Sequence, residues 1–189
     1  MTSQEGSGSI HRSVRDTPFA PLRAGSWGAL GQSLYFTRRY DQAIEQMHQT
    51  IDMDASDWFA FVVRGAAYRE TARLSEALAD LKKAKVLGEP IPWPLGELGR
   101  AYALSGNQAE AQEIKDALEE QWKHKHVGAY NIATIYAALG EKDQAFAWLE
   151  KAYEDRSFFL TGLKIDLAMD TLRSDPRFKD LLRRMNFPP

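Results

Sequence analysis

The chain has 189 residues, of which 44% are hydrophobic and 26% charged, and its formal net charge is −2 at pH 7. This composition is typical of a globular protein with one domain or two small ones. It offers no excess of Lys and Arg for phosphate backbones or anionic lipids, so neither a nucleic-acid nor a membrane partner is predicted. The absence of cysteine excludes disulfides, thiolate nucleophiles and Cys-ligated zinc. The N-terminus lacks the basic and apolar regions of a signal peptide, so we expect a cytoplasmic protein.

Residues 1–23 are rich in Ser and Gly, carry Pro18 and Pro21, and show no sustained helical periodicity. Such a composition is typical of a flexible leader. We therefore expect the folded part of the chain to begin near Ala24.

From Ala24 onward the sequence repeats itself every 34 residues. The four blocks span 24–57, 58–91, 92–125 and 126–159. Their eighth position holds a small residue, namely Gly31, Gly65, Gly99 and Ala133. Their eleventh position holds a large one, namely Leu34, Tyr68, Tyr102 and Tyr136, and their twentieth is always alanine, namely Ala43, Ala77, Ala111 and Ala145.

This pattern resembles the tetratricopeptide repeat (TPR), a family whose period is also 34 residues. The resemblance implies that each block forms two antiparallel helices and that the blocks stack into an all-α solenoid with one continuous core. The family's proline at position 32 is absent, since the four blocks hold Ala55, Glu89, Lys123 and Ser157 there. The expected helices span about 26–37, 41–53, 58–71, 75–87, 93–105, 108–122, 126–139 and 143–155.

Local signals agree with these helices. Asp57 and Ser75 are residue types that cap helix N-termini, and Pro92 suits the first turn of a helix. The pairs Gly106-Asn107 and Leu139-Gly140 interrupt the periodicity, so turns are predicted at both.

Residues 160–189 follow the last block and are expected to form a helical cap. Ser174-Asp175-Pro176 has the composition of a helix start. Beyond it we expect an apolar face that packs inward, namely Leu181, Leu182 and Met185, and a solvated face, namely Lys179, Arg183 and Arg184. Two segments, residues 139–157 and 172–187, also resemble the end of TPR arrays that close bacterial multidomain regulators. That resemblance implies a docking or sensory role in bacterial signalling.

Catalytic and metal-binding patterns are missing from the sequence. His11 lies in the leader, His48 on a predicted outer helix face, and His124 and His126 are two residues apart and point in different directions on a helix. There is no phosphate-binding loop, nucleophile elbow, zinc-protease motif or dinucleotide fingerprint. We therefore predict a non-catalytic protein without metal or cofactor.

In the TPR family, set positions of the first helix of each repeat line a concave surface that binds partners. Carried onto this sequence, they predict a partner-binding set of Tyr35, Phe36, Phe59, Val62, Val63, Arg69, Glu70, Trp93, Glu97, Arg100, Tyr130 and Asn131. The set is rich in apolar and aromatic residues, which are typical of binding surfaces. An alternative is structural: Arg69 could pair with Glu97, or Glu70 with Arg100, while the leader or the cap covers the apolar residues.

One known binding activity of the family can be checked against the residues of this sequence. Co-chaperone repeats clamp acidic carboxyl-terminal tails with Lys, Arg and Asn at set positions, and here those positions hold Gly28, Gln32, Val63, Trp93 and Glu97. No binding to such tails is predicted. The leading hypothesis is a scaffold or adaptor that holds another protein or peptide in the concave groove. Two alternatives stay open: a module that associates with itself as a homo-oligomer, and a sensor that binds a small ligand in the aromatic groove.

Overall fold

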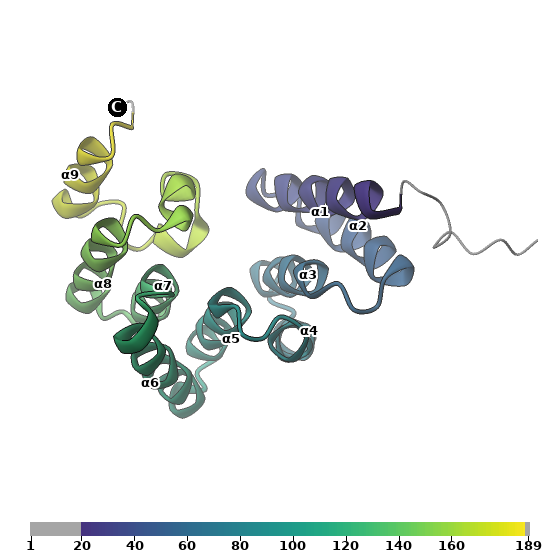
Figure 1. The fold of residues 1–189 in the computed structure, drawn as a ribbon, viewed down its shortest axis with the longest axis horizontal. Coiled ribbons are helices and arrows are strands. Elements are labelled where there is room, and N and C mark those ends of the chain that lie inside the picture. The colour runs from purple at the N-terminus through teal and green to yellow at the C-terminus, as the bar shows by residue number, and fades with distance from the viewer. Residues whose placement is uncertain (1–19, 188–189) are drawn as a thin grey trace, which may run out of the picture.

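The computed structural model describes residues 20–187, with side chains from Trp27 onward, and within that part the fold is all-α (Figure 1). Eight helices form four antiparallel pairs: α1 (Ala20–Phe36) with α2 (Tyr40–Met53), α3 (Trp58–Glu70) with α4 (Leu74–Leu87), α5 (Pro92–Leu104) with α6 (Gln108–Lys125), and α7 (Ala129–Leu139) with α8 (Lys142–Glu154). Two short 3-10 helices follow, η2 (Phe158–Gly162) and η3 (Leu167–Met169), before the final helix α9 (Pro176–Arg184). The predicted solenoid of helix pairs is confirmed.

Most helix bounds lie within two residues of the predicted ones, with exceptions at three helix ends. Helix α1 begins at Ala20, inside the segment expected to be a leader, whose residues 1–19 lie outside the described part. Helix α6 runs on to Lys125, and α7 starts at Ala129 instead of near 126. Both shifts have one cause: His126 and Gly128 have φ angles of 50° and 88°, a left-handed backbone that ends one helix before the next begins.

The predicted helix caps are confirmed in part. The Asp57 side chain accepts hydrogen bonds from the backbone N–H groups of Phe59 (3.0 Å) and Ala60 (3.2 Å), and Asp175 caps α9 in the same way. The prediction that Ser75 caps a helix was wrong, because α4 begins at Leu74 and its N-cap residue is Arg73. The turns at Gly106 and Gly140 are confirmed, with φ angles of 81° and 82°.

Close contact between helices explains the small residues of the repeat. A Cβ atom added at Gly65 would lie 2.8 Å from Cγ of Leu81, and one added at Gly99 would lie 2.6 Å from Cδ1 of Ile135. The alanine at position 20 of every block is fully buried. Only glycine, or alanine with its single methyl group, allows the backbones to approach this closely. The small residues of the repeat are therefore a packing requirement.

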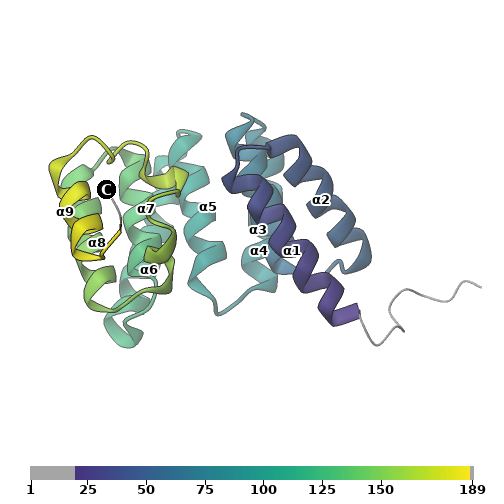
Figure 2. The same cartoon turned by 90° about the horizontal axis from the view of Figure 1, so that it is seen from above.

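The four pairs form an arc, with the first helix of each pair on its inner, concave side (Figures 1 and 2). After α8, residues 158–170 turn back onto this concave side and face α1 (Figure 1). We call them the closing segment. Its Leu167 packs against the core cluster of the first two repeats, which includes Tyr35 and Met47, and its Asp170 lies 3.3 Å from the Arg38 guanidinium.

The residues after α8 therefore form two parts with different contacts, the closing segment and helix α9. Helix α9 stacks on the last repeat as expected, with Phe178 and Leu181 buried in the core of α7 and α8, and with Leu182 and Met185 half-buried against it. Arg184, expected in solvent, is half-buried because it forms a two-pronged ion pair with Glu150 (2.7 and 2.8 Å). The closing segment adds no layer to the stack and covers part of the concave face instead.

Candidate functional site

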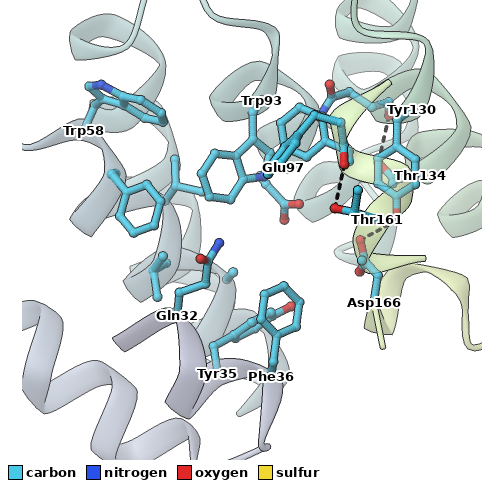
Figure 3. Close-up of a pocket in the computed structure, with 18 residues that line it drawn as sticks. Gln32, Tyr35, Phe36, Trp58, Trp93, Glu97, Tyr130, Thr134, Thr161 and Asp166 are labelled. Carbon is cyan, nitrogen blue, oxygen red and sulfur yellow. Dashed lines mark hydrogen bonds between the residues drawn. The ribbon is translucent and has the colours of Figure 1, made fainter. Parts of the chain in front are cut away.

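A pocket of about 420 Å³ lies on the concave face, between the first helices and the closing segment (Figure 3). It is lined by Gln32, Tyr35, Phe36, Trp58, Phe59, Val62, Val63, Ala66, Trp93, Glu97, Tyr130, Asn131, Thr134, Phe158, Phe159, Thr161, Gly162 and Asp166. Trp93 and Glu97 project into the middle, with Trp58 and Gln32 on one side and Tyr130, Thr161 and Asp166 on the other (Figure 3). All four repeats and the closing segment contribute to this one site.

Aromatic rings form a connected wall of the pocket. The Trp93 ring lies 5.9 Å from the Trp58 ring and 5.4 Å from the Phe59 ring, centre to centre, at steep angles of 87° and 67°. Its third neighbour is Phe159, at 5.9 Å, which in turn stacks on Tyr130. Aromatic rings prefer such offset and edge-to-face arrangements, so these contacts hold each ring in place at the cavity surface.

Nine of the twelve predicted site residues line this pocket: Tyr35, Phe36, Phe59, Val62, Val63, Trp93, Glu97, Tyr130 and Asn131. The other three, Arg69, Glu70 and Arg100, do not line it. The contribution of the closing segment, from Phe158 to Asp166, was not predicted. The adjacent phenylalanines of FFLTG were the available signal, but they fall at the end of the fourth block, beyond its last predicted helix, where no periodicity indicates which way the chain turns.

The two arginines are buried in an ion-pair network behind the pocket, and each is only 5% exposed. Arg69 lies 2.7 Å from Glu97 and 3.3 Å from Glu70, and Arg100 lies 3.5 Å from Glu70. The structural alternative raised for these residues is therefore confirmed. Neither guanidinium faces a partner on the concave surface, since both neutralise the two glutamates inside the protein.

The network also shifts the acidity of its members. Burial alone would raise the pKa of Glu97, but the charges of Arg69 and Arg100 outweigh burial and hold that pKa below its ordinary value. Tyr35 accepts a weak hydrogen bond from Arg69 (3.4 Å) through its hydroxyl. Burial raises the pKa of Tyr35 to about 12 in spite of the neighbouring arginines. At neutral pH Glu97 is therefore ionised and the Tyr35 phenol is neutral.

Polar groups of the pocket lie mainly at its Tyr130 side. The Tyr130 hydroxyl donates a hydrogen bond to Oδ2 of Asp166 (2.6 Å), and the Ala168 backbone N–H donates to Oδ1 (2.8 Å). Burial and the Asp166 charge raise the pKa of Tyr130 well above its ordinary value, so this phenol stays a donor. Oδ1 of Asn131 is buried and has no hydrogen-bond partner.

The described histidines lie away from the pocket. His48 is exposed on α2 near Arg64 and Asp52, His124 contacts Glu120 within α6, and the His126 ring meets Trp122. Residues 20–187 contain no group of three His, Asp or Glu side chains placed to hold a metal ion. Among the described helices, none combines the length and the apolar character needed to cross a bilayer.

Comparison with known protein families identifies one of the four repeats. Residues 128–154, which cover α7 and α8, match the family model described as a tetratricopeptide repeat. None of the curated proteins matches the chain significantly. TPR repeats are generally non-catalytic modules that bind proteins or peptides. The matched repeat supports a tetratricopeptide repeat assignment, and the paired helices before it are consistent with a TPR-like helical solenoid.

Proposed function

We propose that this chain is a protein-interaction module that holds a short segment of a partner protein in the pocket on its concave face. The observation that carries the proposal is the pocket itself, a cavity of about 420 Å³ with a connected aromatic wall. Aromatic side chains are the commonest anchors of protein interfaces, because they bury much apolar area at a small cost in conformational entropy.

The mouth of the pocket supports the same proposal. Phe158 is 80% exposed there, although it is fully apolar. A partner segment that enters the pocket would cover this ring and remove its surface from water. The closing segment already covers part of the concave face, so a short segment fits better than a long peptide laid across all four repeats.

Peptide display against the immobilised protein tests the proposal. The informative variant is Gln32→Trp, because Gln32 lines the pocket from α1 and its enlargement fills the cavity without removing a core side chain. The matched control is Gln112→Trp, at an exposed position on α6 outside the pocket. Selected peptides should lose most of their affinity for Gln32→Trp and keep it for Gln112→Trp.

Two results would contradict the proposal. Peptides that bind wild type and Gln32→Trp equally would place the interaction on another surface. A selection that yields no binder above background would mean that the pocket is not a peptide site.

The enclosure of the pocket favours a second candidate, a sensor of a small ligand. Small-molecule sites are mostly apolar cavities of about 300–1,000 Å³, and this pocket falls in that range. Native mass spectrometry of the purified protein distinguishes the two, since a sensor would carry or acquire a small molecule that Gln32→Trp excludes. Sedimentation of the same sample tests self-association, in which a second copy would cover Phe158.

The finer assignments belong to the same proposal. A cytoplasmic adaptor in bacterial signalling is supported by the resemblance of the C-terminal part to arrays that close bacterial regulators. Boundaries of the four repeats at 24–57, 58–91, 92–125 and 126–159 are supported by the helix pairs, each of which falls largely within one block.

A further inference from the structure

The two acidic side chains of the pocket are paired differently. Glu97 and Asp166 are the charged residues among those that line it. Glu97 forms ion pairs with Arg69 (2.7 Å) and Arg100 (4.0 Å). The Asp166 carboxylate accepts two hydrogen bonds, and the nearby Arg173 guanidinium donates to the Asp166 backbone oxygen (2.9 Å) and not to the carboxylate. Among the described residues, this carboxylate therefore lies in the pocket wall without an ion pair of its own.

A second acceptor among the lining residues lacks a partner within the described part of the chain. Asn131 is 2% exposed, and no donor of the described residues lies within hydrogen-bond distance of its Oδ1. Buried polar atoms are nearly always paired, because leaving one unpaired costs free energy. A hydrogen-bond donor brought by a ligand would satisfy this atom.

The aromatic wall favours the same kind of ligand. Trp93 meets Trp58, Phe59 and Phe159 at angles between 49° and 87°, so faces of differently oriented rings bound the cavity. The face of an aromatic ring carries partial negative charge and attracts cations, most strongly for tryptophan. An acidic ligand would instead meet these faces and the Asp166 carboxylate with its own negative charge.

From these three observations we infer that the occupant of the pocket is a positively charged side chain, Lys or Arg, of the partner segment. The inference rests on the proposed function and adds the chemistry of the anchor. The methylene stem of the side chain lies against Trp93 and Phe159, and its cationic end donates to Asp166 and Asn131. A long cationic side chain suits such a site because its stem is apolar and its end is charged.

Three small probes of similar length test the inference on the whole protein: N-acetyl-lysine methylamide, its norleucine analogue, which lacks the charge, and its glutamate analogue. Binding is followed by NMR through the indole N–H signals of Trp58 and Trp93. The signals of Trp122 and Trp148, which pack on each other between α6 and α8, serve as an internal control.

The inference predicts that the lysine probe shifts the two pocket signals and binds about tenfold tighter than the norleucine probe, as expected for a charge-assisted hydrogen bond. The glutamate probe should leave the signals unchanged. Equal binding of lysine and norleucine would overturn the inference and leave the proposed function standing. If no probe moves the pocket signals, both the inference and the proposed function are contradicted.

Asp166→Asn supplies the matched variant. Asparagine keeps Oδ1 as the acceptor for the Ala168 N–H, and its amide NH2 can donate to the Tyr130 hydroxyl oxygen in place of the bond that is lost, so the closing segment should stay folded. Its affinity for the lysine probe should fall about tenfold, to that of norleucine. Asp143→Asn removes the same charge at an exposed site on α8 and should bind as wild type does. An unchanged affinity in Asp166→Asn would contradict the inference.

Discussion

The repeat array and the closing segment reach the same pocket by different kinds of contact. In the array, each side chain packs against its own or the neighbouring repeat, so one pattern of small and large residues specifies four layers. The closing segment joins the last repeat to the first: Leu167 packs against the core around Tyr35, and Phe159 stacks on Tyr130. Periodic positions therefore form the back of the pocket, and unique residues form its front.

The largest loss of stability is expected from a substitution in the buried ion-pair network of the array. Arg69→Ala removes the nearer of the two guanidinium groups that pair with Glu97, leaving Arg100 at 4.0 Å, and should lower the free energy of unfolding by about 3–5 kcal/mol, the cost typical of breaking a buried ion pair. Chemical denaturation measures it. The double variant Arg69→Met, Glu97→Gln should recover most of the loss, and a single variant as stable as wild type would show that the pair is not buried as described.

Glycines in the two regions sharpen the contrast. Gly65→Val should cost about 1–3 kcal/mol, because its Cβ alone would lie 2.8 Å from Cγ of Leu81. Gly162→Val, in the closing segment, has no heavy atom within 4 Å of the added Cβ and should change stability by less than about 0.5 kcal/mol. Thermal unfolding of both variants gives the comparison, which fails if the two lose equal stability.

Acid should weaken the array through Glu97. Its pKa is depressed in the folded protein, so its contribution to stability is complete above the unfolded pKa of about 4.3 and is lost as pH falls through the lower folded value. Stability measured by urea unfolding should therefore decline below that pH. In Glu97→Gln this part of the decline should be missing, and an unaltered pH profile would count against the depressed pKa.

The smallest effect is expected at the ion pair that ties the two ends together. Arg38 and Asp170 are both largely exposed, so Arg38→Gln should cost less than about 1 kcal/mol. Amide hydrogen exchange of residues 158–170 should rise slightly, while that of α3 and α5 stays constant. A loss of several kcal/mol would mean that the apolar contact of Leu167 is not what holds the closing segment.

Much of the fold could be predicted from the sequence, because the same pattern of small and large residues recurs in all four blocks. Gly31, Gly65 and Gly99 indicate close helices, and Asp57 and Asp175 mark helix starts, through interactions that reach no further than the neighbouring repeat. The nine pocket residues on the array were predicted for the same reason. Period alone carries no information on how far a side chain is buried, so Arg69 and Arg100 were assigned to the partner-facing surface although they pair inside the protein.

The closing segment could not be predicted in the same way. Some of its contacts join residues more than a hundred positions apart, such as Arg38 and Asp170, and each occurs once. Phe158 and Phe159 stand at the end of the fourth block with no predicted role, although one is exposed at the mouth of the pocket and the other lines its wall. Asp166 was missed for the same reason, and with it the carboxylate that lies in the pocket wall.

The central claim is that the closing segment lies across the concave face and completes the pocket. Proton NOEs between aromatic rings test it most directly, because they report only on short distances. We expect NOEs from the Phe159 ring to those of Tyr130 and Trp93, whose centres lie 5.9 Å away in each case. Absence of both, with the NOEs between Trp122 and Trp148 present in the same spectrum, would contradict the claim and leave the concave face an open groove.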